Sequence, residues 1–233
     1  MYQDIEYNGV RSSAMKIYAR ERPSIPAAQQ RTEEITILGR DGSLFTSDGA
    51  FEPTEIPVLF NYIGKETQWA DRWRKAQEWL SARNSILRFA DDSGFFFRIS
   101  HVTIDSVERT TARIGNFTAT FHTRDGLYYL DTGLRECDPE EIGYNPYETA
   151  HPIYKITGEG TCTIIVNGNQ IRANVGQNLT IDTERMIAYR QDGTLQNTKI
   201  SGDYENMYLT KGMNRVRATD GFDVKIIPNW RCR

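Results

Sequence analysis

The side chains that could bind a metal are scattered along the chain and form no recognisable motif. His101, His122 and His151 lie far apart, and no HxxxH or HxxE motif accompanies them, whereas zinc ligands usually come in closely spaced pairs. His122 falls on the polar face of its predicted strand, while His101 continues the apolar face of another, so the two rings need not share a side. We therefore predict no metal site.

Motifs for nucleophilic catalysis and nucleotide binding are also missing from the sequence. It contains no GxSxG elbow, no GxGxxG and no GxxxxGK[ST] motif. Cys137, Cys162 and Cys232 are an odd, scattered set without a CxxC pair, unlike a disulfide framework. Carboxylates are numerous, but only distant residues could supply the two carboxyls of a glycosidase, and a hydrolase is kept as a third alternative on that ground. We predict no catalytic residues and no cofactor.

The composition is that of a globular protein with a core of its own. The chain has 233 residues, of which 39% are hydrophobic and 25% charged, enough to bury a core without disulfides. A formal net charge of −3 argues against binding to nucleic acid or to an anionic membrane. The first residues lack the basic and apolar regions of a signal peptide, so none is expected, and no apolar run approaches the ~18 residues of a membrane span. We expect a soluble protein made in a reducing compartment, with no membrane partner.

One helix is predicted in the first half of the chain, over residues 68–83. Apolar side chains recur there at helical spacing and form one stripe, with a further indole beside it: Trp69, Trp73, Ala76, Leu80 and Trp79. Thr67 can cap the start of this helix. We assign the stripe to the core of the first domain and not to a binding surface.

Strands are predicted on both sides of this helix. Alternating apolar and polar residues place them at 56–63, 85–90, 95–104 and 116–123. A helix with an apolar stripe needs a sheet to pack against. Residues 1–132 are therefore predicted to form a split β-barrel-like domain, mainly β, with one α-helix.

The second half of the chain reads as a linker followed by a small β-sandwich. Residues 133–152 contain several Pro and Gly without a sustained period, which is typical of a connection between domains. Beyond them, Asn167-Gly168 is a strong hairpin signal. Short strands at regular spacing are predicted at 153–157, 161–166, 170–173, 179–182, 186–189, 206–210, 214–218 and 222–227.

Several short segments follow one another in a characteristic order over nearly the whole chain. They are Tyr7-Asn8-Gly9, Gly39-Arg40-Asp41-Gly42-Ser43, Leu87 to Asp92, Ile165 to Gly168, Leu209 to Asn214 and Ile227 to Arg231. Each is weak alone, but together their order and spacing resemble the distal tail protein (Dit) family of siphophages, in which the second segment corresponds to a GRDG turn.

The resemblance implies a structural protein of the phage tail tip. It implies a ring-forming belt domain (1–132), a galectin-like β-sandwich (153–233), and a homo-hexamer of one or two stacked rings joined head to tail. The implied partners are the tail tube protein, the tail-associated hub protein and a peripheral receptor-binding protein, with DNA passing through the central channel without specific binding. Such a protein is located in the virion, at the tail tip or baseplate, after assembly in the bacterial cytoplasm.

Two sets of residues are candidates for binding. The turn Gly39, Arg40, Asp41, Gly42 and Ser43 is the candidate interface with a neighbouring subunit or the tail tube, and a plain β-turn is the competing interpretation. The alternative function is a carbohydrate-binding module for host recognition. Its aromatic platform would consist of Tyr189, Tyr204 and Tyr208.

Overall fold

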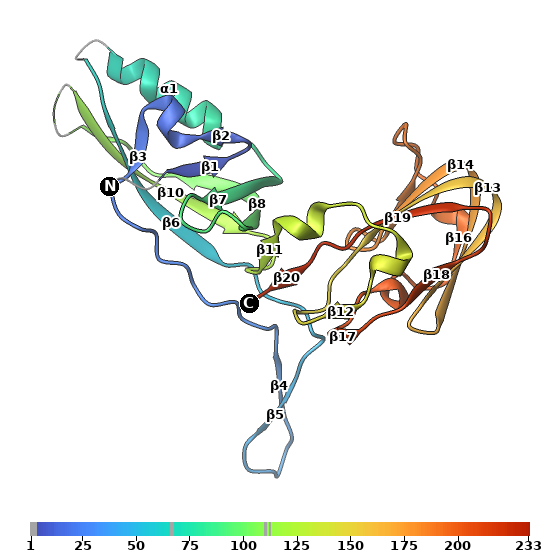
Figure 1. The fold of residues 1–233 in the computed structure, drawn as a ribbon. Coiled ribbons are helices and arrows are strands. Elements are labelled where there is room, and N and C mark those ends of the chain that lie inside the picture. The colour runs from blue at the N-terminus through green and yellow to red at the C-terminus, as the bar shows by residue number, and fades with distance from the viewer. Residues whose placement is uncertain (1–3, 66–67, 110, 112) are drawn as a thin grey trace. The chain divides into compact units, whose positions relative to one another are not determined.

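The chain forms two compact units, each with its own hydrophobic core. The computed structural model describes residues 4–65, 68–109, 111 and 113–233. The first unit comprises Met1–Tyr128 together with Arg233, and the second comprises Tyr129–Cys232. Both are built mainly from β-strands, and the described residues contain one α-helix (Figure 1). The prediction of a mainly β protein with a single helix is thus confirmed.

An antiparallel sheet forms the body of the first unit. Its strands are β1 (Ile5–Tyr7), β2 (Val10–Arg11), β3 (Ile17–Ala19), β6 (Glu55–Ile63), β7 (Ser85–Phe89), β8 (Phe95–Ile104), β9 (Glu108–Arg109) and β10 (Ile114–Thr123), with the 3-10 helix η1 (Ser12–Met15). The order is β2-β1-β7-β8-β10-β6-β3, and β9 pairs with β10. Chain-distant strands are therefore neighbours: β10 pairs with β6 along nine residue pairs, from Ile114↔Ile63 to His122↔Glu55.

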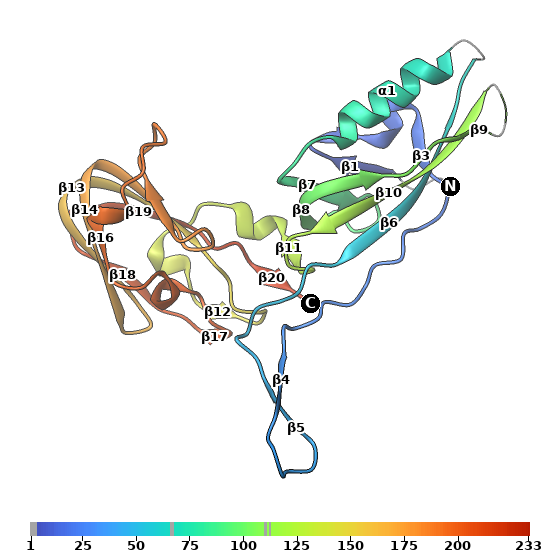
Figure 2. The same cartoon turned by 180° about the vertical axis from the view of Figure 1, so that it is seen from behind.

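The helix α1 (Trp69–Leu80) packs against this sheet, as Figure 2 shows from behind. It is shorter than the predicted 68–83, because Ser81 already serves as its C-terminal cap. Thr67 lies outside the described residues. Trp79 and Leu80 are buried, and the Trp79 indole N–H donates a hydrogen bond of 2.9 Å to the Tyr7 carbonyl. This bond fixes the end of the helix against β1.

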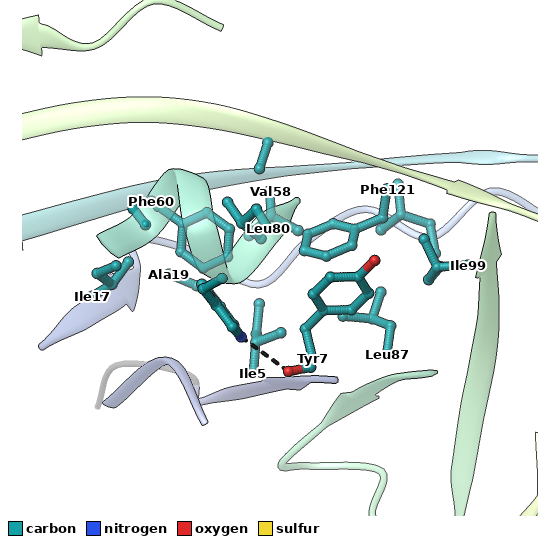
Figure 3. Packing of buried hydrophobic residues seen from close by; sticks show 14 of the residues in the cluster. Ile5, Tyr7, Ile17, Ala19, Val58, Phe60, Leu80, Leu87, Ile99 and Phe121 are labelled. Atoms are coloured by element: carbon teal, nitrogen blue, oxygen red, sulfur yellow. Dashed lines mark hydrogen bonds between the residues drawn. The ribbon is translucent and has the colours of Figure 1, made fainter. Parts of the chain in front are cut away.

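Aromatic rings fill the space between the helix and the sheet. Figure 3 shows Tyr7, Phe60, Leu80 and Phe121 converging in this core. The Phe121 ring contacts the Tyr7 ring edge to face at 5.3 Å between centroids, and Trp73 contacts Phe117 at 5.1 Å. Such edge-to-face pairs stabilise a core beyond simple area burial.

The second unit is built around a long antiparallel hairpin. Its strands are β11 (Tyr128–Leu130), whose first residue belongs to the first unit, β12 (Tyr144–Asn145), β13 (Ile153–Val166), β14 (Asn169–Asp182), β15 (Ile187–Tyr189), β16 (Ile200–Ser201), β17 (Gly212–Met213), β18 (Val216–Ala218), β19 (Asp223–Ile227) and β20 (Arg231–Cys232). Four 3-10 helices join them: η3 (Asp131–Leu134), η4 (Pro139–Glu141), η5 (Asn197–Lys199) and η6 (Tyr204–Met207). The sheet order is β15-β14-β13-β18, with β16 on β14 and β19 on β13, while β12 and β17 form a separate pair.

Several predicted strands of this unit differ from the observed ones. The strands predicted at 153–157 and 161–166 are one strand, β13, and those at 170–173 and 179–182 are one strand, β14. The glycines between them suggested breaks, but the ladder continues through Gly158↔Gln177 and Gly160↔Val175. Continuous cross-strand pairing outweighs the weak strand propensity of glycine. The strand predicted at 206–210 is also wrong, because η6 occupies its first part.

Residues 133–152, which we predicted as a linker, lie in the second unit. Ile142 and Ala150 are buried in its core. Cys137 exchanges two backbone hydrogen bonds of 2.9 Å with Ile226, and Ala150 is bridged to Leu209. The Pro-rich composition therefore reflects irregular backbone that covers the sheet of this unit.

Candidate interaction surface

The predicted GRDG turn closes a hairpin that forms a sheet of its own. Strand β4 (Glu33–Thr36) pairs with β5 (Ser43–Thr46), from Glu33↔Thr46 to Thr36↔Ser43. Within the loop, the Arg40 N–H donates a 3.2 Å hydrogen bond to the Ile37 carbonyl. Gly39 and Gly42 have φ of 82° and 77°, in the left-handed region that favours glycine. These glycines explain why the chain reverses here.

Apolar side chains on both faces of the hairpin point into solvent. Ile35 is paired with Leu44 on one face, and Phe45 lies on the other. The exposed fraction is 68% for Phe45 and 102% for Leu38 at the tip, and Ile37 is exposed as well. A hairpin with no hydrophobic partner is marginally stable in water. The hairpin therefore gains little stability from burying these side chains within the monomer.

Arg31 holds the base of the hairpin to the segment that follows it, residues 48–52. Its guanidinium contacts the carboxylates of Glu52 at 3.0 Å and Asp48 at 3.7 Å. Its backbone N–H donates to the Ala50 carbonyl at 2.8 Å, and the Glu52 N–H donates to the Gln29 carbonyl at 2.8 Å. The hairpin is thus anchored at its base, whereas no side-chain hydrogen bond or ion pair to the described residues holds its tip.

Arg40 and Asp41 lie exposed at the tip of the hairpin. Within the described part of the chain, neither has an ion-pair partner. Sequence reasoning found this turn but missed the apolar residues around it, Leu38 and Leu44 above all. Only the structure shows that Ile35, Ile37 and Phe45 beside the turn are exposed.

The other predicted site residues lie elsewhere. Trp69 and Trp73 are partly buried against the core of the first unit, next to buried Trp79 and Leu80. The Arg109 guanidinium covers the Trp69 ring at 3.9 Å from its centroid. These side chains have structural contacts that leave little of them for a ligand.

The three tyrosines of the proposed glycan platform form no common surface. Tyr189 lies on β15, and Tyr204 begins η6 and packs against the core, where its hydroxyl is buried. Tyr208 stacks on His151 at 4.1 Å between centroids. Burial raises the pKa of Tyr204 and of Tyr208. Among the described residues, no ring contact joins any two of these tyrosines.

The positions of two histidines correct the sequence analysis. His101 and His122 are direct cross-strand partners on β8 and β10, and their rings stack. The His122 Nδ1 lies 3.4 Å from a Glu55 carboxylate oxygen. The described residues nevertheless contain no group of three or more His, Cys, Asp or Glu side chains placed to hold a metal ion. The pair is a feature of the sheet surface.

Cys137 and Cys162 are placed for packing and not for nucleophilic chemistry. Burial raises the pKa of the Cys137 thiol to about 11, and the thiol donates a hydrogen bond to the Ile226 carbonyl. Cys162 is fully buried, and burial raises its pKa as well. A nucleophilic cysteine needs a lowered pKa, so neither thiol is activated.

Among the described residues, no helix has the length and apolar character of a membrane span.

Comparison with solved structures decides the fold. One similar structure is the crystal structure of the SPP1 Dit (gp 19.1) protein, described as a paradigm of the hub adsorption apparatus in phages that infect Gram-positive bacteria. It matches with a TM-score of 0.63 and 14% sequence identity, and the match covers 97% of this chain and 98% of that one. The chain has the Dit fold. A chain of the phage P2 baseplate, in its activated conformation with Ca, matches over 100% of this chain and 99% of its own length with a TM-score of 0.56 and 10% identity. No family model and no curated protein matches the sequence.

The match to the Dit fold extends over both units of the chain. Nearly all of each compared chain is covered, so neither unit is an added or missing part. At 14% and 10% identity, the similarity lies in the arrangement of elements and not in shared side chains. This is why the resemblance seen in the sequence rests on the order of short segments.

Proposed function

We propose that the chain is a non-enzymatic structural protein of a phage tail tip or baseplate, located in the virion. The single observation that carries this proposal is the full-length match to the Dit fold, which covers 97% of this chain. Burial raises the pKa of the Cys137 and Cys162 thiols, so neither is an activated nucleophile. Fold alone does not define function, so the exposed hairpin supplies the second argument.

The hairpin β4–β5 is proposed as the contact between neighbouring copies in a hexameric ring. In this proposal the hairpin meets a different surface of the next copy, because head-to-tail contacts of that kind can close into rings. Leu38 and Phe45 would lose their exposed apolar area. Arg40 and Asp41, which have no ion-pair partner among the described residues, would pair across the contact.

The domain roles follow the same proposal. Residues 1–132 act as the belt that forms the ring, and residues 153–233 act as a galectin-like β-sandwich at its periphery. One face of the ring would bind the tail tube protein and the other the hub protein, with a receptor-binding protein at the periphery. DNA would pass through the central channel, and a net charge of −3 suits a passage that must not hold phosphates.

The mass of the purified protein in solution tests the ring. Light scattering over a range of concentrations should find a species of six or twelve times 26.8 kDa. Arg40→Glu should shift this species towards the monomer while the far-UV circular dichroism stays unchanged. Arg83→Glu is the matched control, because Arg83 is also exposed and should leave the assembly intact. A wild-type monomer at every concentration would contradict the proposed self-assembly.

A further inference from the structure

A hollow lies in the second unit at the turn of the β13–β14 hairpin. Its volume is about 560 Å³, and its walls include Ile165, Asn167, Thr210, Met213, Arg215 and Arg217. Sites for small ligands typically have volumes of about 300–1,000 Å³. The hollow is therefore large enough for a sugar-sized molecule or one unit of a polymer.

Two arginines give this hollow a positive charge that nothing in the unit neutralises. Arg215 and Arg217 alternate with buried Val216, so they share the outer face of the sheet. Neither has a carboxylate within ion-pair distance among the described residues, and no acidic residue lines the hollow. A third cation, Arg172, has no ion-pair partner in the described part of the chain. It lies on the same face, because it is the cross-strand partner of Thr163 while Arg217 is the partner of Ile165 on the same strand.

The lysines at the other end of the same sheet are different. Lys155 contacts a Glu136 carboxylate oxygen at 2.5 Å, and Lys225 contacts Asp138 at 2.6 Å. A strong hydrogen bond to Asp138 raises the pKa of Lys225. The two lysines far from the hollow are thus neutralised by carboxylates, whereas the two arginines that line it have no carboxylate partner among the described residues.

Hydrogen bonds of the buried Asn214 hold together several residues that line the hollow. Asn214 is buried at 1% exposure, and its amide N–H groups donate to the carbonyls of Thr210 at 2.8 Å and Gly212 at 3.0 Å. The Asn167 amide donates to the Asn214 side-chain oxygen at 2.9 Å, and the Arg215 N–H donates to the Asn167 side-chain oxygen at 2.9 Å. These bonds fix the backbone of Arg215 before any ligand arrives, which reduces the entropy lost on binding.

We propose that this hollow is a binding site for an oxyanion, a phosphate or carboxylate group carried by a small ligand or by one unit of a polymer. Guanidinium groups bind such anions through paired N–H donors. Met213 and Ile165 would contact the carbon atoms of the ligand. The walls contain no aromatic ring on which a neutral sugar could stack, so charge and not stacking provides the recognition. The site does not depend on ring formation.

Titration of the full-length protein at low ionic strength tests the proposal. NMR spectroscopy follows the backbone amide chemical shifts while inorganic phosphate, glucose 6-phosphate, glucuronate or glucose is added. An oxyanion probe should shift the Gly168 and Arg215 amides saturably, and glucose should not. Loss of a charge-assisted contact should weaken binding about tenfold in Arg217→Gln, whereas Lys199→Gln, which removes an exposed charge elsewhere in the unit, should bind as wild type.

The outcomes separate the sources of the anion and can overturn the site. Saturation by the two phosphates but not by glucuronate assigns a phosphate ligand, and the reverse assigns a carboxylate. Arg217→Lys, which keeps the charge but loses the paired donors, should lie between wild type and Arg217→Gln. The proposal is overturned if none of the three anions binds saturably, if Lys199→Gln weakens binding as much as Arg217→Gln, or if glucose binds equally well to wild type and Arg217→Gln.

Discussion

His101 and His122 stack face to face on adjacent strands, with ring centroids 4.3 Å apart and an interplanar angle of 3°. A β-bulge brings them together. His122 pairs with His101 but the next residue of β10, Thr123, pairs with Ile99, so Ser100 is an extra residue on β8. The extra residue shifts the alternation, which turns His101 outward. The Ser100 hydroxyl donates to the His122 carbonyl at 3.0 Å and holds the bulge in place.

Deleting Ser100 should therefore destabilise the first unit severely. Without the bulge, either His101 turns into the core or the pairing of β8 with β10 slips, because a one-residue shift exchanges the two faces of a strand. We expect a loss of about 2 kcal/mol or more in the free energy of unfolding, measured in urea. Ser100→Ala keeps the residue count and should cost much less. Equal stability of the deletion and the wild type would show that the bulge does not determine the face of His101.

Gly115 is the position on β10 where any side chain collides with the core. A Cβ built there lies 2.3 Å from the Tyr62 ring, whose hydroxyl is buried and has no hydrogen-bond partner among the described residues. Because the Tyr62 ring is fully buried and cannot swing away, Gly115→Ala should destabilise the protein by about 1–3 kcal/mol. Gly94→Ala is the control, since nothing lies within 4 Å of its Cβ. Thermal unfolding of both variants measures the difference.

Tyr7 should make the protein sensitive to alkali. Burial raises its pKa to about 12, and its hydroxyl donates to the Ala82 carbonyl at 2.5 Å. In the unfolded chain the phenol ionises at pH ~10. The stability that the buried, neutral Tyr7 side chain contributes is therefore complete below that pH, and it is lost as the pH rises towards about 12. Tyr7→Phe should lower stability near pH 7 but flatten this alkaline decline, which unfolding in urea from pH 8 to 11.5 measures. A decline as steep as that of the wild type would assign the effect to other groups.

The hairpin should contribute to association and not to the stability of the monomer. Leu38→Ser with Phe45→Ser removes apolar side chains that are 102% and 68% exposed, so the free energy of unfolding of the monomer should change by less than about 0.5 kcal/mol. The same variant should lose the oligomer in light scattering. Leu195→Ser, at a residue 64% exposed in the second unit, is the matched control and should assemble normally. A double variant that assembles like the wild type would exclude the hairpin as the contact.

Local signals in the sequence were sufficient for the elements that depend on short-range chemistry. The apolar spacing from Trp69 to Leu80 predicts the helix, and the paired glycines around Arg40 predict the turn, because helix periodicity and left-handed backbone are properties of a few neighbouring residues. The alternation along residues 116–123 likewise predicts the strand β10. The order of such segments was enough to suggest the Dit fold.

What only the tertiary structure decided depends on residues that are distant in the sequence. The bulge at Ser100 places His101 beside His122, and no pattern within β8 reveals it, because a bulge is defined by the partner strand. Gly158 and Gly160 continue a strand because β14 pairs with them throughout. Exposure of Leu38 and the absence of an acid beside Arg217 are likewise properties of the folded surface. The sequence by itself thus determined elements with strong local signals, such as the helix, the glycine turn and β10. Long-range packing decided where other strands continue and which faces stay exposed.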